Sequence, residues 1–259
     1  GLFHLAAVYA LYLKDPDLMF RVNVEGTRKL LEAAVRHQIK HVVYTSSIAA
    51  VSARVGRTPA DETCQFDPTG IDEVYVLSKG ASERVALDAA QELDLVAVNP
   101  SFPVGPGDIN PTPTGRLVRD VARGRLPIRI SGGSNLVDVR DVAQGHVLAY
   151  QRGRRGERYL LSGHNLTIDE FMARICSIVG RSAPRVRLPD SAVHGIAACM
   201  GAVARLTGIA PMLTPASARY TVGKFLFFDN KKAQEELGFV NRPADETLKD
   251  ALAWFDERG

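Results

Sequence analysis

Short apolar runs alternate with longer amphipathic stretches through the first hundred residues. The runs at 2–7, 41–45 and 95–99 are rich in β-branched and small apolar side chains, which is typical of buried parallel strands. At 15–37 and 75–93, apolar side chains recur every three or four residues, which predicts two amphipathic helices. Strands alternating with helices predict a parallel sheet with crossover helices.

After residue 110 the pattern is less regular and predicts a mixture of helices and strands. Thr167, followed three residues later by Glu170, predicts a helix with a capping box. Helices are predicted at 115–123, 140–150, 167–179, 190–207, 215–220, 229–237 and 243–255, and strands at 127–130, 135–139, 159–161, 185–188 and 225–228. We expect one unit over 1–110, with 128–150 returning to its sheet, and a smaller unit over 111–259.

Composition and charge narrow the class of protein. The chain has 259 residues, 46% hydrophobic and 24% charged, and a net charge of +3, which argues against nucleic acid or a membrane surface as a partner. The most apolar stretch, 192–206, is too short to span a bilayer. Cys64, Cys176 and Cys199 are odd in number and show no metal spacing, so we expect no metal site and a reducing, cytoplasmic setting.

Polar residues follow two of the predicted strands where each strand ends. Ser46 and Ser47 come directly after 41–45, and Asn99 and Pro100 end the next strand. The carboxyl ends of parallel strands lie at one edge of a sheet, where ligands bind in such folds. Taken alone, two serines at a strand end also suit ordinary turn chemistry.

Tyr75 and Lys79 lie four residues apart near the start of a predicted helix, 28 residues after Ser47. This spacing places both side chains on one helix face. A neighbouring ammonium group favours the phenolate, so we expect Lys79 to lower the pKa of Tyr75 and fit it for general acid/base chemistry. Taken alone, the pair is more often two residues on a solvated helix face.

Together with their order along the chain, these residues indicate a family. The matching motifs are His4-Leu5-Ala6-Ala7, Asn23-Val24-Glu25-Gly26-Thr27, Val43-Tyr44-Thr45-Ser46-Ser47, Tyr75-x-x-x-Lys79, Val104-Gly105-Pro106-Gly107, Val137 to Ala143 and Asp229 to Phe239. The chain resembles an extended short-chain dehydrogenase/reductase of the NAD-dependent epimerase/dehydratase group. Within that group, residues 99–116 are similar to hopanoid-associated sugar epimerases, and dihydroflavonol 4-reductases look similar as well.

The resemblance implies an α/β fold and a hydride-transfer chemistry. The expected fold is a Rossmann-type doubly wound parallel sheet lacking its first βαβα half, with a smaller mixed α+β C-terminal substrate domain. The expected cofactor is NAD or NADP, which exchanges a hydride with a carbinol or carbonyl carbon. By resemblance, Tyr75 is the general acid/base, Lys79 also hydrogen-bonds the nicotinamide ribose, and Ser47 holds the substrate oxygen.

The resemblance also suggests which residues contact the cofactor and the substrate. The expected cofactor contacts are Leu5, Ala6, Ala7, Asn23, Thr45, Ser46, Tyr75, Lys79 and Pro100. Core packing is an alternative for the Leu5–Ala7 segment, and a solvated or locally bonded amide is an alternative for Asn23. The substrate is expected to contact Ser47 and Phe102. A homodimer through the helices at 15–37 and 73–93 is also consistent with the family.

The chain differs from the family pattern in two respects: it lacks part of the cofactor-binding motifs, and two substrate-binding positions carry other residues. The glycine-rich pyrophosphate turn and the residue that selects NAD or NADP are absent. We therefore expect that about 60 residues precede Gly1 in the natural protein, that the chain as it stands is inactive and binds the dinucleotide poorly, and that its first strand has an open apolar edge. Phe102 and Ser134 replace an Asn and an Arg of sugar-nucleotide epimerases.

These replacements leave three functions open. The first is an NAD(P)-dependent oxidoreductase or epimerase acting on a small molecule, a sugar or an apolar ketone or alcohol. The second is an NADPH-dependent ketone reductase of the dihydroflavonol or steroid type, which Phe102 favours. The third is a non-catalytic dinucleotide sensor or inactive fragment, which the presence of both Tyr75 and Lys79 disfavours.

Overall fold

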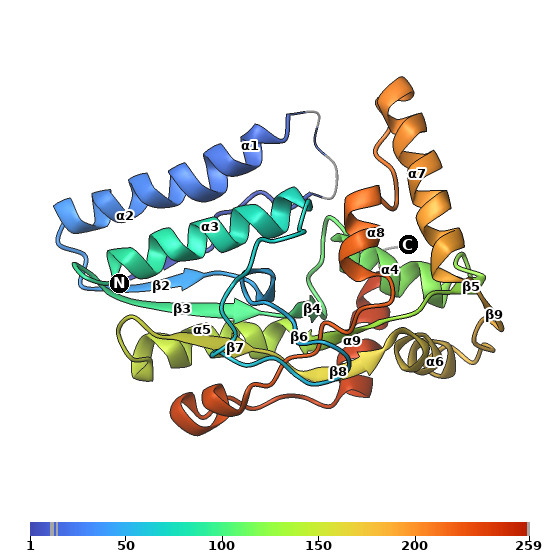
Figure 1. The fold of residues 1–259 in the computed structure, drawn as a ribbon. Helices are drawn as coiled ribbons and strands as arrows, with labels where there is room; N and C mark the ends of the chain where they lie inside the picture. Colours follow the sequence, from blue (N-terminus) through green and yellow to red (C-terminus); the bar gives the residue numbers. More distant parts are fainter. Residues whose placement is uncertain (11–12, 14, 258–259) are drawn as a thin grey trace.

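A four-stranded parallel sheet forms the centre of the computed structural model, which describes residues 1–10, 13 and 15–257 (Figure 1). The strand order is β1 (Leu2–His4), β2 (His41–Thr45), β3 (Asp94–Pro100) and β7 (Arg158–Leu161). All three pairings are parallel. The expected α/β class with a parallel sheet is confirmed. The last two residues of the predicted substrate domain lie outside this description.

Helices cover both faces of this sheet. Helices α1 (Asp17–Phe20), α2 (Thr27–Arg36) and α3 (Val74–Ala89) lie on one face, and α5 (Val139–Arg152) lies on the other (Figure 1). Alternate residues of each strand point to opposite faces. The even-numbered side chains of β2 therefore pack with α2 and α3, whereas its central side chain at position 43 packs with α5.

The helix predicted at 15–37 contains a break. Between α1 and α2 the chain forms a π-helical segment, Arg21–Gly26. Its Asn23 is buried and 1% exposed. A π-helical turn inserts one residue into the helix, and such turns often lie at functional sites. The hydrophobic period of the sequence continues through this segment and so did not predict it.

A second, smaller sheet continues from the end of β3. Strands β4 (Phe102–Val104) and β6 (Gly133–Asp138) are parallel, and β8 (His164–Thr167) pairs antiparallel with β6. Strands β5 (Ile128–Arg129) and β9 (Val186–Arg187) form a separate pair. We expected residues 128–150 to return to the main sheet. Helix α5 does pack on that sheet, but β6 belongs to the second sheet and β5 to the separate strand pair.

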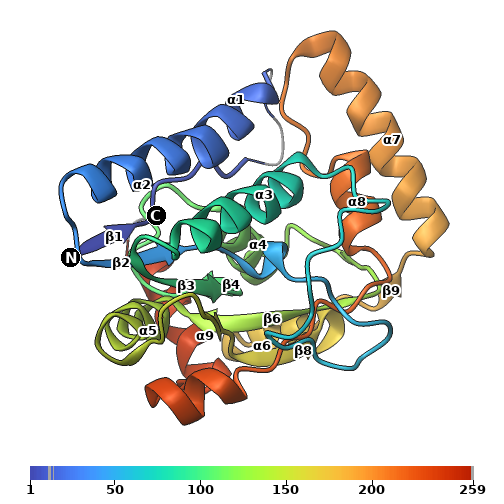
Figure 2. The same ribbon diagram turned by 60° about the vertical axis from the view of Figure 1, so that its left-hand side comes forward.

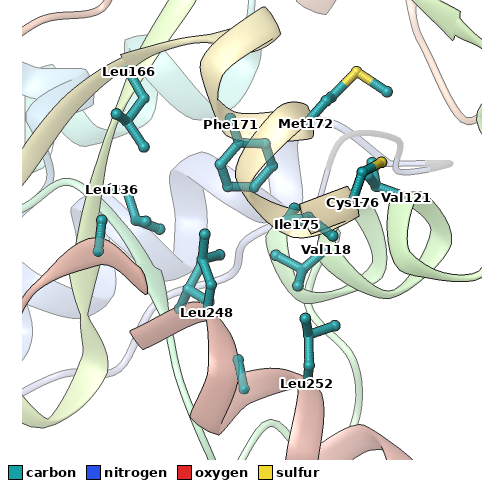
Figure 3. Packing of buried hydrophobic residues seen from close by; sticks show 13 residues of the cluster. Val118, Val121, Leu136, Leu166, Phe171, Met172, Ile175, Cys176, Leu248 and Leu252 are labelled. Atoms are coloured by element: carbon teal, nitrogen blue, oxygen red, sulfur yellow. The ribbon is translucent and has the colours of Figure 1, made fainter. Parts of the chain in front are cut away.

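The second sheet has its own hydrophobic core. Figure 3 shows side chains from α4 (Pro113–Ala122), α6 (Ile168–Ile178) and α9 (Ala244–Asp256) packed together there. Val118 and Leu248 are fully buried within it. The capping box predicted at Thr167 is confirmed at the start of α6.

Helices α7 (Asp190–Thr207) and α8 (Pro215–Thr221) stand together at one end of the molecule, near α4 (Figures 1 and 2). The strand predicted at 225–228 is instead an extended segment that makes only isolated bridges, at Phe225 and Phe228. Its backbone connects the two main parts of the fold, because these bridges reach Gly133 and Ala60. Within the described residues, no helix is both long and apolar enough to cross a membrane.

Candidate active site

A cavity of about 660 Å³ lies beyond the carboxyl ends of β2 and β3. Its wall combines the ends of these strands, the start of α3, the loop leading to α4, and α8. Six of the residues singled out in the sequence line it: Thr45, Ser46, Ser47, Tyr75, Pro100 and Phe102. The expectation that these polar strand ends converge on one ligand-sized space is therefore met.

Ser47 is held in place through both its side chain and its backbone. It is the N-cap of a short 3₁₀ helix, Ile48–Ala50, and its Oγ accepts a hydrogen bond from the Ala49 amide at 3.1 Å. The Ser47 carbonyl accepts a hydrogen bond from Asn99 Nδ2 at 2.9 Å. The serine hydroxyl therefore faces the cavity from a fixed turn rather than from a flexible loop.

A buried polar network supports Asn99 from behind. Its Nδ2 also hydrogen-bonds the carboxylate of Glu83, on α3. Glu83 forms an ion pair with Arg158 at 2.9 Å, and both side chains are almost completely buried. Arg158 in turn donates hydrogen bonds to the carbonyls of Glu62 and Cys64. The network thus connects β3, β7, α3 and the loop at 62–64.

Tyr75 lies in the first turn of α3 and is enclosed by other polar and aromatic groups. Its ring packs against that of Tyr9, with 4.6 Å between centroids. Burial raises the pKa of Tyr75, and a hydrogen bond with the Ser47 side chain acts in the opposite direction. The two residues expected to share the substrate oxygen are therefore neighbours.

The structure corrects the expected effect of Lys79. Its ammonium turns toward the sheet, where Nζ donates a hydrogen bond to the Thr45 carbonyl at 2.9 Å and lies 3.4 Å from the Tyr44 hydroxyl. The pKa of Tyr75 is raised rather than lowered, and Lys79 does not contribute to its shift. The prediction that Lys79 lowers the pKa of Tyr75 is therefore wrong for this arrangement. Burial lowers the pKa of Lys79 itself to about 8, against the charge of Glu83.

Thr45 lines the cavity, and its hydroxyl has a hydrogen-bond partner, His146, that the sequence did not indicate. Its Oγ1 lies 2.8 Å from His146 Nε2, and His146 Nδ1 lies 2.8 Å from the Val142 carbonyl. A carbonyl only accepts, so Nδ1 carries the proton and Nε2 accepts from the threonine hydroxyl. Burial lowers the pKa of His146, which favours this neutral form. The histidine thus orients a cavity-lining hydroxyl.

Asn23 connects α3 with the segment that follows β1. Its Nδ2 donates to the Val8 carbonyl and to Ser78 Oγ, each at 3.0 Å, and its Oδ1 accepts from the Val8 amide at 2.7 Å. A solvated amide is therefore excluded. Asn23 lies outside the cavity lining, so its expected cofactor contact stays a prediction.

The segment Leu5–Ala7 differs most from expectation. Strand β1 ends at His4, and the three following side chains are exposed, Leu5 by 60%. These three side chains therefore do not pack in the hydrophobic core of the described residues. Phe3, on the same edge strand, is also exposed, which confirms the expected open apolar edge. The cofactor contact expected of Leu5–Ala7 stays a prediction.

Among the cavity residues that the sequence did not indicate are Tyr9, Glu73 and Tyr220. Glu73 directly precedes α3 and stands two positions before Tyr75, a local signal that could have been used. Tyr9 follows the end of β1 by five residues. Tyr220 lies on α8, 145 positions after Tyr75, and no local pattern connects the two. Within the described part of the chain, no three His, Cys, Asp or Glu side chains are grouped to hold a metal.

Comparisons with known proteins agree with this arrangement. Residues 1–162 match the model of the NAD dependent epimerase/dehydratase family. A Synechocystis protein named "Putative dihydroflavonol 4-reductase" is 38% identical, over all of this chain and 77% of its own length. Sterol demethylase protein B of Methylococcus capsulatus is 34% identical, over all of this chain and 79% of its own length.

A solved structure is similar as well. The structure of a nucleoside-diphosphate-sugar epimerase from Pseudomonas aeruginosa is 30% identical and has a TM-score of 0.75, over 92% of this chain and 74% of the other. The family is NAD dependent, which supports a nicotinamide dinucleotide as the cofactor, whereas the choice between NAD and NADP stays a prediction. The chain belongs to the NAD dependent epimerase/dehydratase family.

Proposed function

We propose that the protein is an NAD(P)-dependent reductase of an uncharged, largely apolar ketone, with Tyr75 as the proton donor. One observation carries the choice of substrate. The described residues that line the cavity include no Lys or Arg, and the two ionisable acids among them are Glu73 and Asp108. A cavity of this kind suits neither the diphosphate of a sugar nucleotide nor any other anion.

The rest of the lining supports the same substrate class. Apolar side chains from several elements face the space: Phe102, Leu117, Val139, Leu213, Leu226 and Phe255. Polar side chains also line the space, and Ser47 and Tyr75 are among them. A mostly apolar pocket that also holds a few polar groups suits an apolar body that bears one reactive carbonyl.

The raised pKa of Tyr75 fits the direction of the reaction. At neutral pH the phenol keeps its proton and donates it to a carbonyl oxygen that gains negative charge. Ser47 stands beside Tyr75 and supplies a second hydroxyl to the same oxygen, which stabilises the developing charge. The carbonyl becomes an alcohol, and the Tyr75 phenolate is then reprotonated from solvent.

The residues near Tyr75 fit a nicotinamide dinucleotide. Ser46 Oγ is buried, faces the cavity and has no hydrogen-bond partner, so it offers an unused polar atom there. Lys79, Thr45 and Pro100 are the residues that would hold the nicotinamide end, and Leu5–Ala7 the segment that would follow it. When bound, the cofactor supplies the hydride that reduces the carbonyl carbon.

Sugar-nucleotide epimerisation is the second candidate, because the Pseudomonas epimerase is 30% identical to this chain. The two functions are separated by following NADPH absorbance and sugar interconversion with the full-length protein. We expect stoichiometric NADPH consumption with a dihydroflavonol or a steroid ketone and no interconversion of UDP-glucose. Sugar interconversion without consumption of NADPH by any ketone of the panel would overturn the proposal.

A further inference from the structure

His146 connects the helix on one face of the main sheet with the cavity at the end of β2. It lies on α5, on the face opposite α3, and its side chain is buried. Its Nδ1 lies 2.8 Å from the Val142 carbonyl, and its Nε2 lies 2.8 Å from Thr45 Oγ1. Among the described residues, Thr45 Oγ1 has no other hydrogen-bond partner. The imidazole ring therefore determines how this hydroxyl is used.

The ring fixes which way the hydroxyl proton points. The proton on Nδ1 is engaged by the Val142 carbonyl, and burial lowers the pKa of His146, so the ring is neutral at neutral pH. Its Nε2 then offers only a lone pair, and Thr45 gives its one hydroxyl proton to that atom. A free hydroxyl either donates or accepts by rotating, but this one has no proton left to donate. Toward the cavity, Thr45 Oγ1 is an acceptor only.

Thr45 is held through its backbone as well as through its side chain. Its carbonyl accepts a hydrogen bond from Lys79 Nζ on α3 at 2.9 Å, and it pairs with Val98 in the register of β2 and β3. A β-branched side chain has few rotamers, so a threonine held at both groups keeps one orientation. Because Thr45 lines the cavity, its acceptor oxygen is in place before any ligand binds.

We propose that His146 is a positioning residue that presents Thr45 Oγ1 to the cavity as a hydrogen-bond acceptor for an N–H or O–H group of a bound ligand. The inference rests on the proposed function and specifies the chemistry of one contact in its site. A nicotinamide dinucleotide carries such donors in its carboxamide and ribose groups, and a hydroxylated substrate carries one as well. A carbonyl or ether oxygen gains no hydrogen bond at this position.

Two amide variants of His146 separate its two hydrogen bonds. His146→Asn keeps a donor near the position of Nδ1, toward Val142, and removes the acceptor for Thr45. His146→Gln keeps an acceptor near the position of Nε2, toward Thr45. In His146→Asn the hydroxyl of Thr45 is free to turn its proton into the cavity, so we expect ligand affinity to fall about fivefold, the effect of one hydrogen bond. In His146→Gln most of that affinity returns.

Thr45→Val removes the acceptor itself and keeps the shape of the side chain. With the full-length protein, fluorescence titration gives the Kd for NADPH, and steady-state kinetics give the KM for the ketone. We expect a rise of about fivefold in one of the two. A rise in Kd identifies the cofactor as the source of the donor, and a rise in KM alone identifies the substrate. In the double variant with His146→Asn the loss should not exceed that of Thr45→Val, because both changes remove the same contact.

Three outcomes would overturn the role of His146. The first is that Thr45→Val leaves both constants within twofold of the natural values. The second is that the losses of His146→Asn and Thr45→Val add in full, and the third is that His146→Gln binds no better than His146→Asn. Urea unfolding verifies that each variant is folded, and His146→Phe, which keeps a ring of similar size, replaces His146→Asn if that variant is not. If no ketone is reduced, the reductase function fails, and the NADPH titration alone decides: an unchanged Kd in Thr45→Val then overturns this inference too.

Discussion

The two sides of Tyr75 differ in how completely their polar groups are paired. On the sheet side, Lys79 and Asn23 are almost fully buried and make hydrogen bonds at 2.9–3.0 Å. On the cavity side, Ser46, Glu73 and Ser101 each bury a side-chain oxygen that has no partner among the described residues. The residues of both sides are buried, with exposed fractions of 1–8%, so burial alone does not explain the difference.

This contrast distinguishes the groups that hold the site in place from the groups that bind its ligands. Paired groups on the sheet side fix the positions of α3 and of the strand ends, as a preorganised site requires. Unpaired oxygens on the cavity side cost about 1–3 kcal/mol each in the absence of a ligand. We infer that they are kept for hydrogen bonds to the cofactor and the substrate. The predictions below test this division by changing one group on each side.

The largest effect is expected at the buried ion pair of the sheet side. Glu83→Ala leaves the buried Arg158 guanidinium without its carboxylate partner, which should lower the free energy of unfolding by about 3–5 kcal/mol. Asp245→Ala breaks the exposed ion pair with Arg174 and should cost less than about 1 kcal/mol. Urea unfolding of both variants makes the comparison. Equal losses would show that the network does not support the site.

Glu73 should make stability depend on pH. Its pKa is about 7 in the folded protein and 4.5 in the reference state, so between these values the folded state binds more protons than the unfolded state. Unfolding free energy therefore falls as pH rises from 4.5 to 7, by about 3 kcal/mol. Comparison with Glu73→Gln at each pH isolates this contribution. A difference between the two proteins that stays constant with pH would rule out the raised pKa.

Replacing either of two serines by alanine should change the stability of the protein, but in opposite directions. Ser82 Oγ hydrogen-bonds the Tyr44 hydroxyl at 2.7 Å, so Ser82→Ala should destabilise the protein by about 1 kcal/mol. Ser101 Oγ is buried without a partner, so Ser101→Ala should stabilise the unliganded protein by about 1 kcal/mol. Thermal unfolding at matched pH measures both. Destabilisation by Ser101→Ala would mean that its hydroxyl is already satisfied.

Local patterns predicted the sheet and the site residues that stand at strand ends. Ser47 and Pro100 could be placed because the carboxyl ends of parallel strands share one edge. The orientation of Lys79 could not be predicted, because the helical spacing that relates it to Tyr75 says nothing of the Thr45 carbonyl, which attracts its ammonium. Tyr220 reaches the site through the packing of α8, which depends on contacts between distant segments.

The end of β1 is a second feature that the sequence pattern did not predict. The apolar run at 2–7 predicted a strand, but only Leu2–His4 pair with β2, and Leu5 is exposed. Hydrophobicity alone does not determine where pairing ends, because each strand residue needs a partner in register. The π-helical segment was missed for a similar reason, since its Asn23 hydrogen-bonds Val8 and Ser78, which are distant in sequence.

The central claim is that Tyr75 transfers the proton, and substitution at two neighbouring phenols tests it most directly. In the full-length protein, Tyr75→Phe should lower kcat for ketone reduction by about 10²–10⁴-fold, while the affinity for NADPH, measured by fluorescence titration, stays within about threefold. Tyr9→Phe, on the ring that packs against Tyr75, should lower kcat by less than about tenfold. Equal rates for Tyr75→Phe and the natural protein would contradict the assigned role.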